Sequence, residues 1–275
     1  MSKDPSCWLH ELAWPEVEAH LKGSDLALVP IGATEQHGPH LPLLVDSGWA
    51  IAAAEGAALK AGVLAAPPLH VGWSPHHLGF PGSLTLRPET LIQVTLDVCE
   101  SLVFHGFHRI VIVNGNRIAN LPPLEIAASK LRHRTGAQVV IADVGLIARE
   151  EIDPICDSPP GGQDHAGESE TAFMLAWRPE LVDMTKAVTE IPERRSAFNE
   201  PIEFEPAYYG NSVSVVRTAA DKPRLPGSTG VSGDARSATA EKGARIIDAM
   251  VANLVRLIDE MRQTPLGDIR AEIPY

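Results

Sequence analysis

Four short apolar segments alternate with longer helical segments along the first half of the chain. They cover residues 25–31, 63–66, 109–114 and 138–143. Each is short, and the clearest of them, Arg109–Asn114, holds four branched apolar residues in a row, as expected for a strand buried on both faces of a sheet. The segments between and after them predict helices at residues 14–22, 46–61, 88–105, 121–133, 167–177 and 238–262. This alternation predicts an α/β fold with a mainly parallel sheet.

Two further regions carry weaker predictions. Residues 150–162 are rich in Asp, Pro and Gly, and because apolar periodicity resumes directly afterwards, we expect a long ordered loop there. Residues 192–226 are proline-rich, with a strand expected at 213–216. Residues 71–82 contain Gly, Pro and His in an irregular order, which is typical of a loop that contacts a ligand or of a surface turn.

Composition narrows the class of protein. With 275 residues, 44% of them hydrophobic, the chain can bury a substantial core. Its formal net charge of −12 argues against a nucleic-acid groove or binding to an anionic membrane surface, because both favour concentrated Lys and Arg. Three cysteines without CxxC spacing favour a reducing, cytoplasmic compartment, and we expect neither a signal peptide nor a membrane helix.

A cluster of potential metal ligands follows the first predicted strand. Glu35, His37 and Asp46 offer carboxylate and imidazole donors, which suit a divalent cation such as zinc or manganese. Asp46 could instead be the N-cap of the following helix, and the two roles are compatible. His40 follows a proline and is expected to hold this loop by hydrogen bonding.

A second source of donors lies at residues 164–170. Glu170 can complete a metal site, while Asp164 beside His165 has the form of a carboxylate that orients an imidazole for acid–base chemistry. The simpler alternative is that Asp164 and His165 cap the helix that begins at Gly167.

Four blocks of sequence, in this order, resemble the creatininase (creatinine amidohydrolase) family. They are Pro30-Ile-Gly-Ala-Thr-Glu-Gln-His-Gly-Pro-His-Leu-Pro with Asp46 downstream, His77 through Gly82 with its Phe-Pro-Gly turn, Asp164-His-Ala-Gly-Glu-Ser-Glu-Thr171, and residues 230–243. Together they span nearly the whole chain. The resemblance implies a single three-layer α/β/α domain over residues 1–275, assembly into homo-oligomers, often hexamers, and a two-metal site that hydrolyses C–N bonds.

Carried over by position, the resemblance assigns roles to individual residues. Glu35, His37, Asp46 and Glu170 match metal ligands, with Asp46 as the bridge, and His165 matches the histidine that handles protons during ring opening. The pairing of Asp164 with His165 is the expected catalytic unit.

One position departs from the family pattern. The turn after the third predicted strand normally reads Asn-Gly-His, and its His binds a metal, whereas this chain has Asn114-Gly115-Asn116-Arg117. An amide oxygen is a weaker zinc ligand than an imidazole, and Arg117 adds positive charge where a cation is expected. The alternative to metal binding for Glu35 is a salt bridge with Arg117. We therefore expect about one tightly bound metal per chain, zinc or manganese with iron as a further candidate, and a weak second site.

The expected activity is metal-dependent hydrolysis of a small cyclic or linear amide, with a metal-activated water and His165 as proton donor. Candidate substrate contacts are His77, Asn116 and Arg117, with the neighbouring His76 also considered. Two alternatives remain: a degenerate member that binds a small ligand without turnover, and a hydrolase of a different bond, such as a lactone. The expected partner is a small molecule, with no nucleic acid and no membrane.

Overall fold

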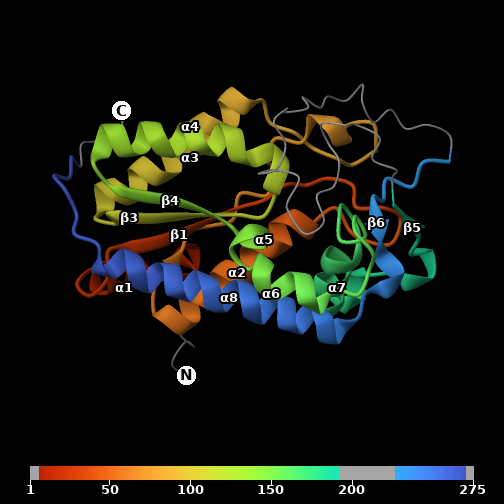
Figure 1. Ribbon diagram of the computed structural model, residues 1–275. Helices are drawn as coiled ribbons and strands as arrows, with labels where there is room; N and C mark the ends of the chain where they lie inside the picture. Colours follow the sequence, from red (N-terminus) through yellow and green to blue (C-terminus); the bar gives the residue numbers. More distant parts are fainter. Residues whose placement is uncertain (1–5, 192–226, 271–275) are drawn as a thin grey trace.

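A four-stranded parallel sheet forms the centre of the computed structural model, which describes residues 6–191 and 227–270. The strand order is β2-β1-β3-β4, and the register pairs Ile31 with Asn114 and Asn114 with Asp143. All three pairings are parallel, which confirms the predicted type of sheet (Figure 1). The strands are β1 (Leu26–Ile31), β2 (Leu64–Ala65), β3 (Arg109–Asn114) and β4 (Gln138–Asp143).

Helices cover both faces of the sheet. In Figure 1, α3 and α4 lie above the sheet and α2 and α8 lie below it, so the molecule has the three layers that the resemblance implied. The helices are α1 (Trp14–Leu21), α2 (Val45–Ala61), α3 (Pro88–His105), α4 (Arg117–Thr135), α5 (Val144–Ile147), α6 (Arg149–Ile152), α7 (Glu168–Trp177) and α8 (Ala240–Gln263). A short antiparallel ribbon of β5 (Thr189–Glu190) and β6 (Gly233–Asp234) lies beside α7.

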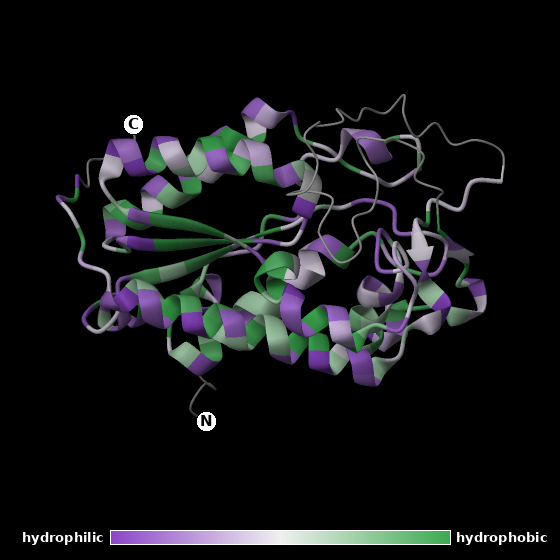
Figure 2. Ribbon diagram, viewed as in Figure 1, coloured by the Kyte–Doolittle hydropathy of each residue, from purple (hydrophilic) through white to green (hydrophobic). Residues whose placement is uncertain are grey.

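Alternation along the strands divides the apolar residues between two cores. Leu28 and Val111 point to the side of α2 and α8, whereas Val29 and Ile112 point to the side of α3 and α4. All four side chains are fully buried, and Figure 2 shows the middle of the strands in the green of hydrophobic residues. Burial on both faces explains why these segments lack the polar alternation of a half-exposed strand.

Helix ends match the predictions where glycine stops the helix and differ where a side chain starts it. Gly62 ends α2 in the left-handed conformation at φ 63°, as predicted. By contrast, α4 begins four residues before the predicted residue 121, because the Asn116 side chain accepts a hydrogen bond from the Ala119 N–H and caps the helix. Pro122 and Pro123 therefore lie inside α4 instead of at its start.

The segment at 150–162, predicted as a loop, contains α6 and a 3₁₀ turn at Asp153–Ile155. The prediction missed these short helical turns because they are anchored by tertiary contacts: Ile152 and Ile155 are buried in the core on the α8 side. The strand predicted at 213–216 lies outside the described residues. None of the described helices is both long and apolar enough to span a membrane.

Candidate metal centre and active site

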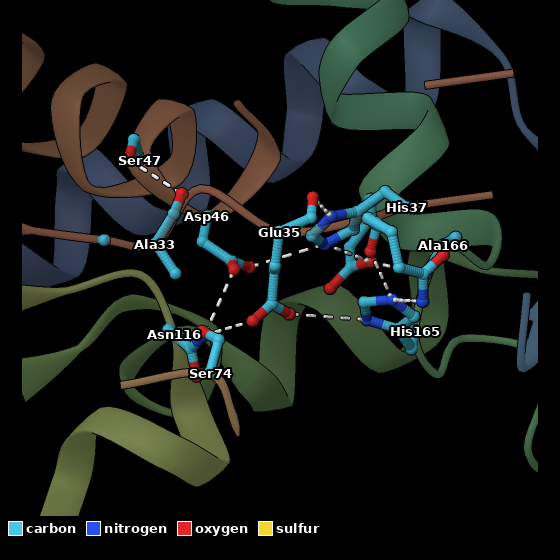
Figure 3. A network of polar contacts seen from close by, with 12 residues as sticks. Ala33, Glu35, His37, Asp46, Ser47, Ser74, Asn116, His165 and Ala166 are labelled. Atoms are coloured by element: carbon cyan, nitrogen blue, oxygen red, sulfur yellow. Dashed lines mark hydrogen bonds and ion pairs between the residues drawn. The ribbon is translucent and has the colours of Figure 1, made fainter. Parts of the chain in front are cut away.

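Loops that follow the carboxyl ends of β1 and β3 meet the first turns of α2 and α7. This edge of a parallel sheet is where α/β proteins commonly bind ligands. The predicted metal ligands all lie here, and Figure 3 shows several of them grouped around Glu35. They are Glu35 and His37 after β1, Asp46 in the first turn of α2 and Glu170 in the first turn of α7.

Close backbone contact brings the β3 turn against α2. A Cβ atom on Gly115 would lie 1.9 Å from the Asp46 carbonyl oxygen, so no other residue fits without moving the backbone. The next residue, Asn116, can therefore reach the Asp46 side chain.

The His37 imidazole has one nitrogen held by the backbone and one aimed at carboxylates. Its Nδ1 lies 3.1 Å from the Glu35 carbonyl oxygen, which can accept only, so Nδ1 carries the proton of the neutral ring. Its Nε2 is fully buried without a hydrogen-bond partner, 3.4 Å from Asp46 Oδ1 and 3.5 Å from Glu170 Oε2. A metal-binding histidine has this arrangement, because its other nitrogen donates to a carbonyl oxygen.

Negative charge is concentrated around this nitrogen. Burial, followed by the neighbouring Asp46 carboxylate, raises the pKa of Glu35 well above its usual value, and burial also raises the pKa of Glu170. Burial disfavours the charged form of His37, but the Asp46 and Glu170 carboxylates outweigh it and raise the pKa of His37 to about 10. The cluster therefore stabilises a positive charge at His37 Nε2, and the donor set fits a divalent cation.

The Asp46 carboxylate divides this cluster into two sides. Its Oδ1 faces His37, and its Oδ2 lies 3.2 Å from the Asn116 side-chain nitrogen. The N-cap of α2 is Leu44, so the alternative role of Asp46 as N-cap is wrong. Asp46 is instead an acidic residue in the first turn of α2, a position where the helix dipole favours a carboxylate.

On the second side, the side-chain amide of Asn116 lies between the carboxylates of Glu35 and Asp46. The Asn116 NH₂ donates to Glu35 Oε2 at 3.0 Å and to Asp46 Oδ2 at 3.2 Å. Its oxygen accepts from the Ala119 N–H, so the cap of α4 fixes the orientation of the amide. Both hydrogens of one neutral group are therefore directed at the Glu35 and Asp46 carboxylates.

Backbone strain positions the last carboxylate. Ala166 has φ 55°, which is unusual for a residue other than glycine, and its N–H donates to Glu170 Oε2 at 2.6 Å. The same oxygen is the one near His37, so this turn aims Glu170 at His37 Nε2.

Two further imidazoles contact the Glu35 side. His77 Nε2 lies 3.3 Å from Glu35 Oε1, and His165 Nδ1 lies 3.8 Å from the same oxygen. The His165 ring also lies 4.3 Å, centre to centre, from both the His37 and His77 rings. His165 therefore lies between the two sides of the cluster, within 4.8 Å of donor atoms on each.

The remaining predicted residues lie nearby in different settings. Gly167, not Asp164 or His165, is the N-cap of α7, and no side chain caps that helix, so the capping alternative is wrong. Asp164 accepts from the Gly167 N–H through its carbonyl oxygen, and its role as a partner of His165 stays a prediction. His76 is buried against the His77 ring at 4.2 Å.

His40 and Arg117 have opposite environments. The buried His40 Nε2 lies 2.9 Å from Thr171 Oγ1, as expected for a residue that holds the loop, and burial lowers the pKa of His40 to about 4. Arg117 is exposed at the start of α4, and its charge opposes the burial that raises the pKa of Glu170. Glu35 contacts Asn116 and His77 in place of the salt bridge with Arg117 considered above.

Sequence reasoning missed two residues of this network, Gln36 and Ser74. Gln36 is buried and its side-chain nitrogen lies within 3.0 Å of both His77 Nδ1 and His165 Nε2. Its position in the sequence between two predicted metal ligands, Glu35 and His37, could have identified it as a residue of the site. Ser74 Oγ lies 3.4 Å from the Asn116 nitrogen, and nothing in its loop sequence distinguishes it from other serines.

Curated relatives match nearly the whole chain. The chain is 30% identical to creatinine amidohydrolase of Pseudomonas putida, over 94% of this chain and 98% of that protein. It is 33% identical to mycofactocin precursor peptide peptidase of Mycobacterium ulcerans, over 87% of each. It is 28% identical to 3-dehydro-scyllo-inosose hydrolase of Thermotoga maritima, over 98% of this chain and 88% of that protein.

Solved structures agree in fold. A mutant creatininase of Zn-Zn type is 26% identical, with a TM-score of 0.75 over 95% of this chain and all of that one. A structure titled "Creatininase Mn" is 28% identical, with a TM-score of 0.73 over 94% of this chain and all of that one. The family model for creatinine amidohydrolase matches residues 10–258. The chain therefore belongs to the creatininase family.

Proposed function

We propose that this protein is a metal-dependent hydrolase that cleaves a C–N bond of a small cyclic or linear amide. The observation that carries the proposal is the unpartnered, fully buried Nε2 of His37, which faces the carboxylates of Asp46 and Glu170. Imidazole nitrogen and carboxylate oxygen are both zinc donors, and three protein ligands with an open position are typical of catalytic zinc sites. Named relatives in the family are hydrolases of an amide, a peptide and an inosose, which supports hydrolysis as the reaction class.

A cation held by His37, Asp46 and Glu170 would polarise the scissile carbonyl and lower the pKa of a water molecule beside it. Hydrogen bonds to the ligand side chains would fix the position of the cation. The Glu35 carbonyl oxygen holds the His37 ring, and the Ala166 N–H holds the Glu170 carboxylate. Such supporting hydrogen bonds keep the ligands in one orientation before the cation arrives.

His165 is the proposed proton donor to the departing nitrogen. Its Nε2 lies 2.7 Å from the Gln36 carbonyl oxygen, so that nitrogen is committed to the backbone. Its Nδ1 faces Glu35 and is the atom that would take a proton from the attacking water and pass it to the departing nitrogen. Asp164 is the proposed partner that assists His165.

Three residues are proposed to contact the substrate: His77, Asn116 and Arg117. Arg117 is the exposed one, at the start of α4 with its guanidinium beside Gly145, and a guanidinium is suited to bind a carbonyl or carboxylate group. Buried His77 and Asn116 touch Glu35 and would act on the part of the substrate nearest the metal.

The proposed metal content is about one tightly bound zinc or manganese ion per chain, with iron as a further candidate. The Asn116 NH₂ group between Glu35 and Asp46 supports this count, because the amide already satisfies the carboxylate oxygens that a second ion would need. Zinc and manganese forms of creatininase support the choice of metals.

A second candidate function is hydrolysis of a bond other than an amide, such as that of a lactone. The relative named an inosose hydrolase favours it, since that name is not one of an amide hydrolase. A degenerate protein that binds its ligand without turnover is the remaining alternative, and Asn116 in place of the family histidine favours it.

A substrate screen with a metal control tests these alternatives. The purified protein would be stripped with a chelator, reloaded with zinc or manganese, and assayed on cyclic amides, formamides, short peptides and lactones. We expect metal-dependent release of amine from an amide, and none from a His37→Ala variant prepared in parallel. Metal-dependent cleavage of lactones alone would select the second candidate, and a protein that binds no metal would refute both hydrolases.

We also propose that the protein works in the cytoplasm as a homo-oligomer, with a hexamer as the expected state. Cys7, Cys99 and Cys156 are free thiols, which agrees with a reducing compartment. Light scattering at several concentrations tests the assembly, and a constant mass near the 29.5 kDa of one chain would refute it.

A further inference from the structure

Gln36 joins the two histidines on the Glu35 side, and its hydrogen bonds determine where their protons lie. Its side-chain nitrogen has three neighbours: the Gly230 carbonyl oxygen at 3.0 Å, His77 Nδ1 at 3.0 Å and His165 Nε2 at 2.8 Å. An amide nitrogen has two hydrogens, so it can donate to two of them.

The backbone fixes the orientation of the Gln36 amide. Its oxygen accepts from the Gly38 N–H at 3.0 Å, and its nitrogen donates to the Gly230 carbonyl oxygen. A flipped amide would set two donors against each other at Gly38 and two acceptors at Gly230. One amide hydrogen is thereby used, and the second must go to a histidine.

His165 is the less favourable acceptor, although its Nε2 lies 2.8 Å from the amide nitrogen. Its Nε2 lies 2.7 Å from the carbonyl oxygen of Gln36 itself, and a carbonyl oxygen only accepts, so His165 Nε2 carries a proton. The second amide hydrogen of Gln36 therefore goes to His77 Nδ1. With Nδ1 as acceptor, the neutral His77 ring carries its proton on Nε2 and donates it to Glu35 Oε1.

We infer that Gln36 is a positioning residue, which sets His77 as a hydrogen-bond donor to Glu35 and leaves His165 with Nδ1 as its reactive nitrogen. The spacing of Glu35, His77 and His165 would also suit a cation. The Gln36 amide opposes that use of His77, because a neutral ring that binds a cation through Nε2 carries its proton on Nδ1, where it would face the Gln36 N–H. The role in catalysis rests on the proposed function of His165, whereas the proton positions do not.

Nitrogen NMR of the zinc-loaded protein tests the proton positions without any substrate. Histidine labelled with ¹⁵N gives different two-bond coupling patterns for rings protonated on Nδ1, protonated on Nε2, or bound to zinc. We expect His77 and His165 each to be protonated on Nε2 and neither to be bound to zinc, with His77→Gln and His165→Ala proteins used to assign the signals. A zinc-bound His77, or one protonated on Nδ1, would overturn the inference.

A pair of variants then tests the effect on the reaction. Gln36→Leu keeps a side chain of similar size and removes the amide, whereas Ser83→Ala removes only the acceptor of the Gln36 backbone N–H, which lies 3.0 Å away. We expect Gln36→Leu to change the His77 signal and to lower kcat by about 10- to 100-fold with KM little changed, as for loss of a residue that orients another. Ser83→Ala should leave the His77 signal as in wild type.

The outcomes separate this inference from the proposed function. Unchanged histidine signals in Gln36→Leu would refute the positioning role. A changed His77 signal with unchanged kcat on an established substrate would refute its catalytic consequence. If no substrate is found, the NMR result on the wild-type protein still decides whether Gln36 sets the protons.

Discussion

The two sides of the Asp46 carboxylate differ in what they offer a cation. On the His37 side, an imidazole nitrogen without a partner faces Asp46 Oδ1 and Glu170. On the Asn116 side, an amide NH₂ donates to Asp46 Oδ2 and Glu35. On the first side no side-chain amide lies between the carboxylates, whereas on the second side the Asn116 amide joins them.

This difference supports the proposal of about one tightly bound metal per chain. Carboxylate oxygens within 4.8 Å of each other repel by about 3 to 4 kcal/mol at an effective dielectric constant of about 20. A dication removes that repulsion, while an amide removes part of it through two hydrogen bonds. The Asn116 amide also caps α4, so the same side chain serves the helix and the site.

Removal of the imidazole on the first side should have the largest effect. His37→Ala deletes a nitrogen ligand, and we expect it to abolish tight metal binding and to lower kcat/KM by about 10³-fold, since metal catalysis contributes several kcal/mol. Elemental analysis and steady-state kinetics would measure both. His70→Ala is the control, because His70 is exposed and its side chain lies outside the metal clusters of the described residues. Retention of one tight metal by His37→Ala would place the ion elsewhere.

His165 lies between the two sides, and its loss should separate catalysis from metal binding. We expect His165→Ala to lower kcat by about 10²-fold while metal content stays at the wild-type value, because a general acid acts in the transition state. Asp164→Asn should lower kcat less, by about tenfold, if the carboxylate assists His165. Wild-type turnover in His165→Ala would remove this residue from the mechanism.

The close contact between the turn after β3 and the first turn of α2, which brings Asn116 to Asp46, can be broken by a substitution in the backbone turn. Gly115→Ala would place a methyl carbon 1.9 Å from the Asp46 carbonyl oxygen, and we expect a loss of about 3 kcal/mol in the free energy of unfolding. That loss corresponds to a fall of about 6 to 12 °C in Tm for a domain of this size class. Gly267→Ala is the matched control, since a Cβ there meets nothing within 4 Å. An unchanged Tm for Gly115→Ala would mean that the turn is free to move away from α2.

The sequence predicted the layers well because the strands are buried on both faces. Runs such as Arg109–Asn114 have no polar alternation, and the structure gives this strand the predicted bounds. The predicted start of α4 was wrong because the Asn116 side chain caps the helix by accepting from the Ala119 N–H, although two prolines follow inside the helix. Helix propensity alone does not show which asparagine is the cap.

The candidate site could be predicted as a set of residues but not as an arrangement. Spacing and family resemblance brought Glu35, His37, Asp46 and Glu170 together, and the structure places them in one cluster. The orientation of the Asn116 amide and the bonds of Gln36 depend on atoms from β3, α4 and residue 230, which are distant in sequence. Local patterns contain no information on such contacts.

The smallest expected effect, about a twofold change in metal content, tests whether the Asn116 amide excludes a second ion from its side of Asp46. Asn116→His replaces the bridging NH₂ with an imidazole that can bind a cation between Glu35 and Asp46, at a cost of about 1 kcal/mol from the lost cap of α4. We expect the tightly bound metal to rise from about one towards two per chain, and further when Arg117→Ala also removes a nearby positive charge. Asn116→Ala is the control, because it removes the amide without supplying a ligand and should not raise the metal content. Two tightly held metals in the wild-type protein would refute this exclusion of a second ion, and would mean that the Asn116 amide turns away from the carboxylates when the ions bind.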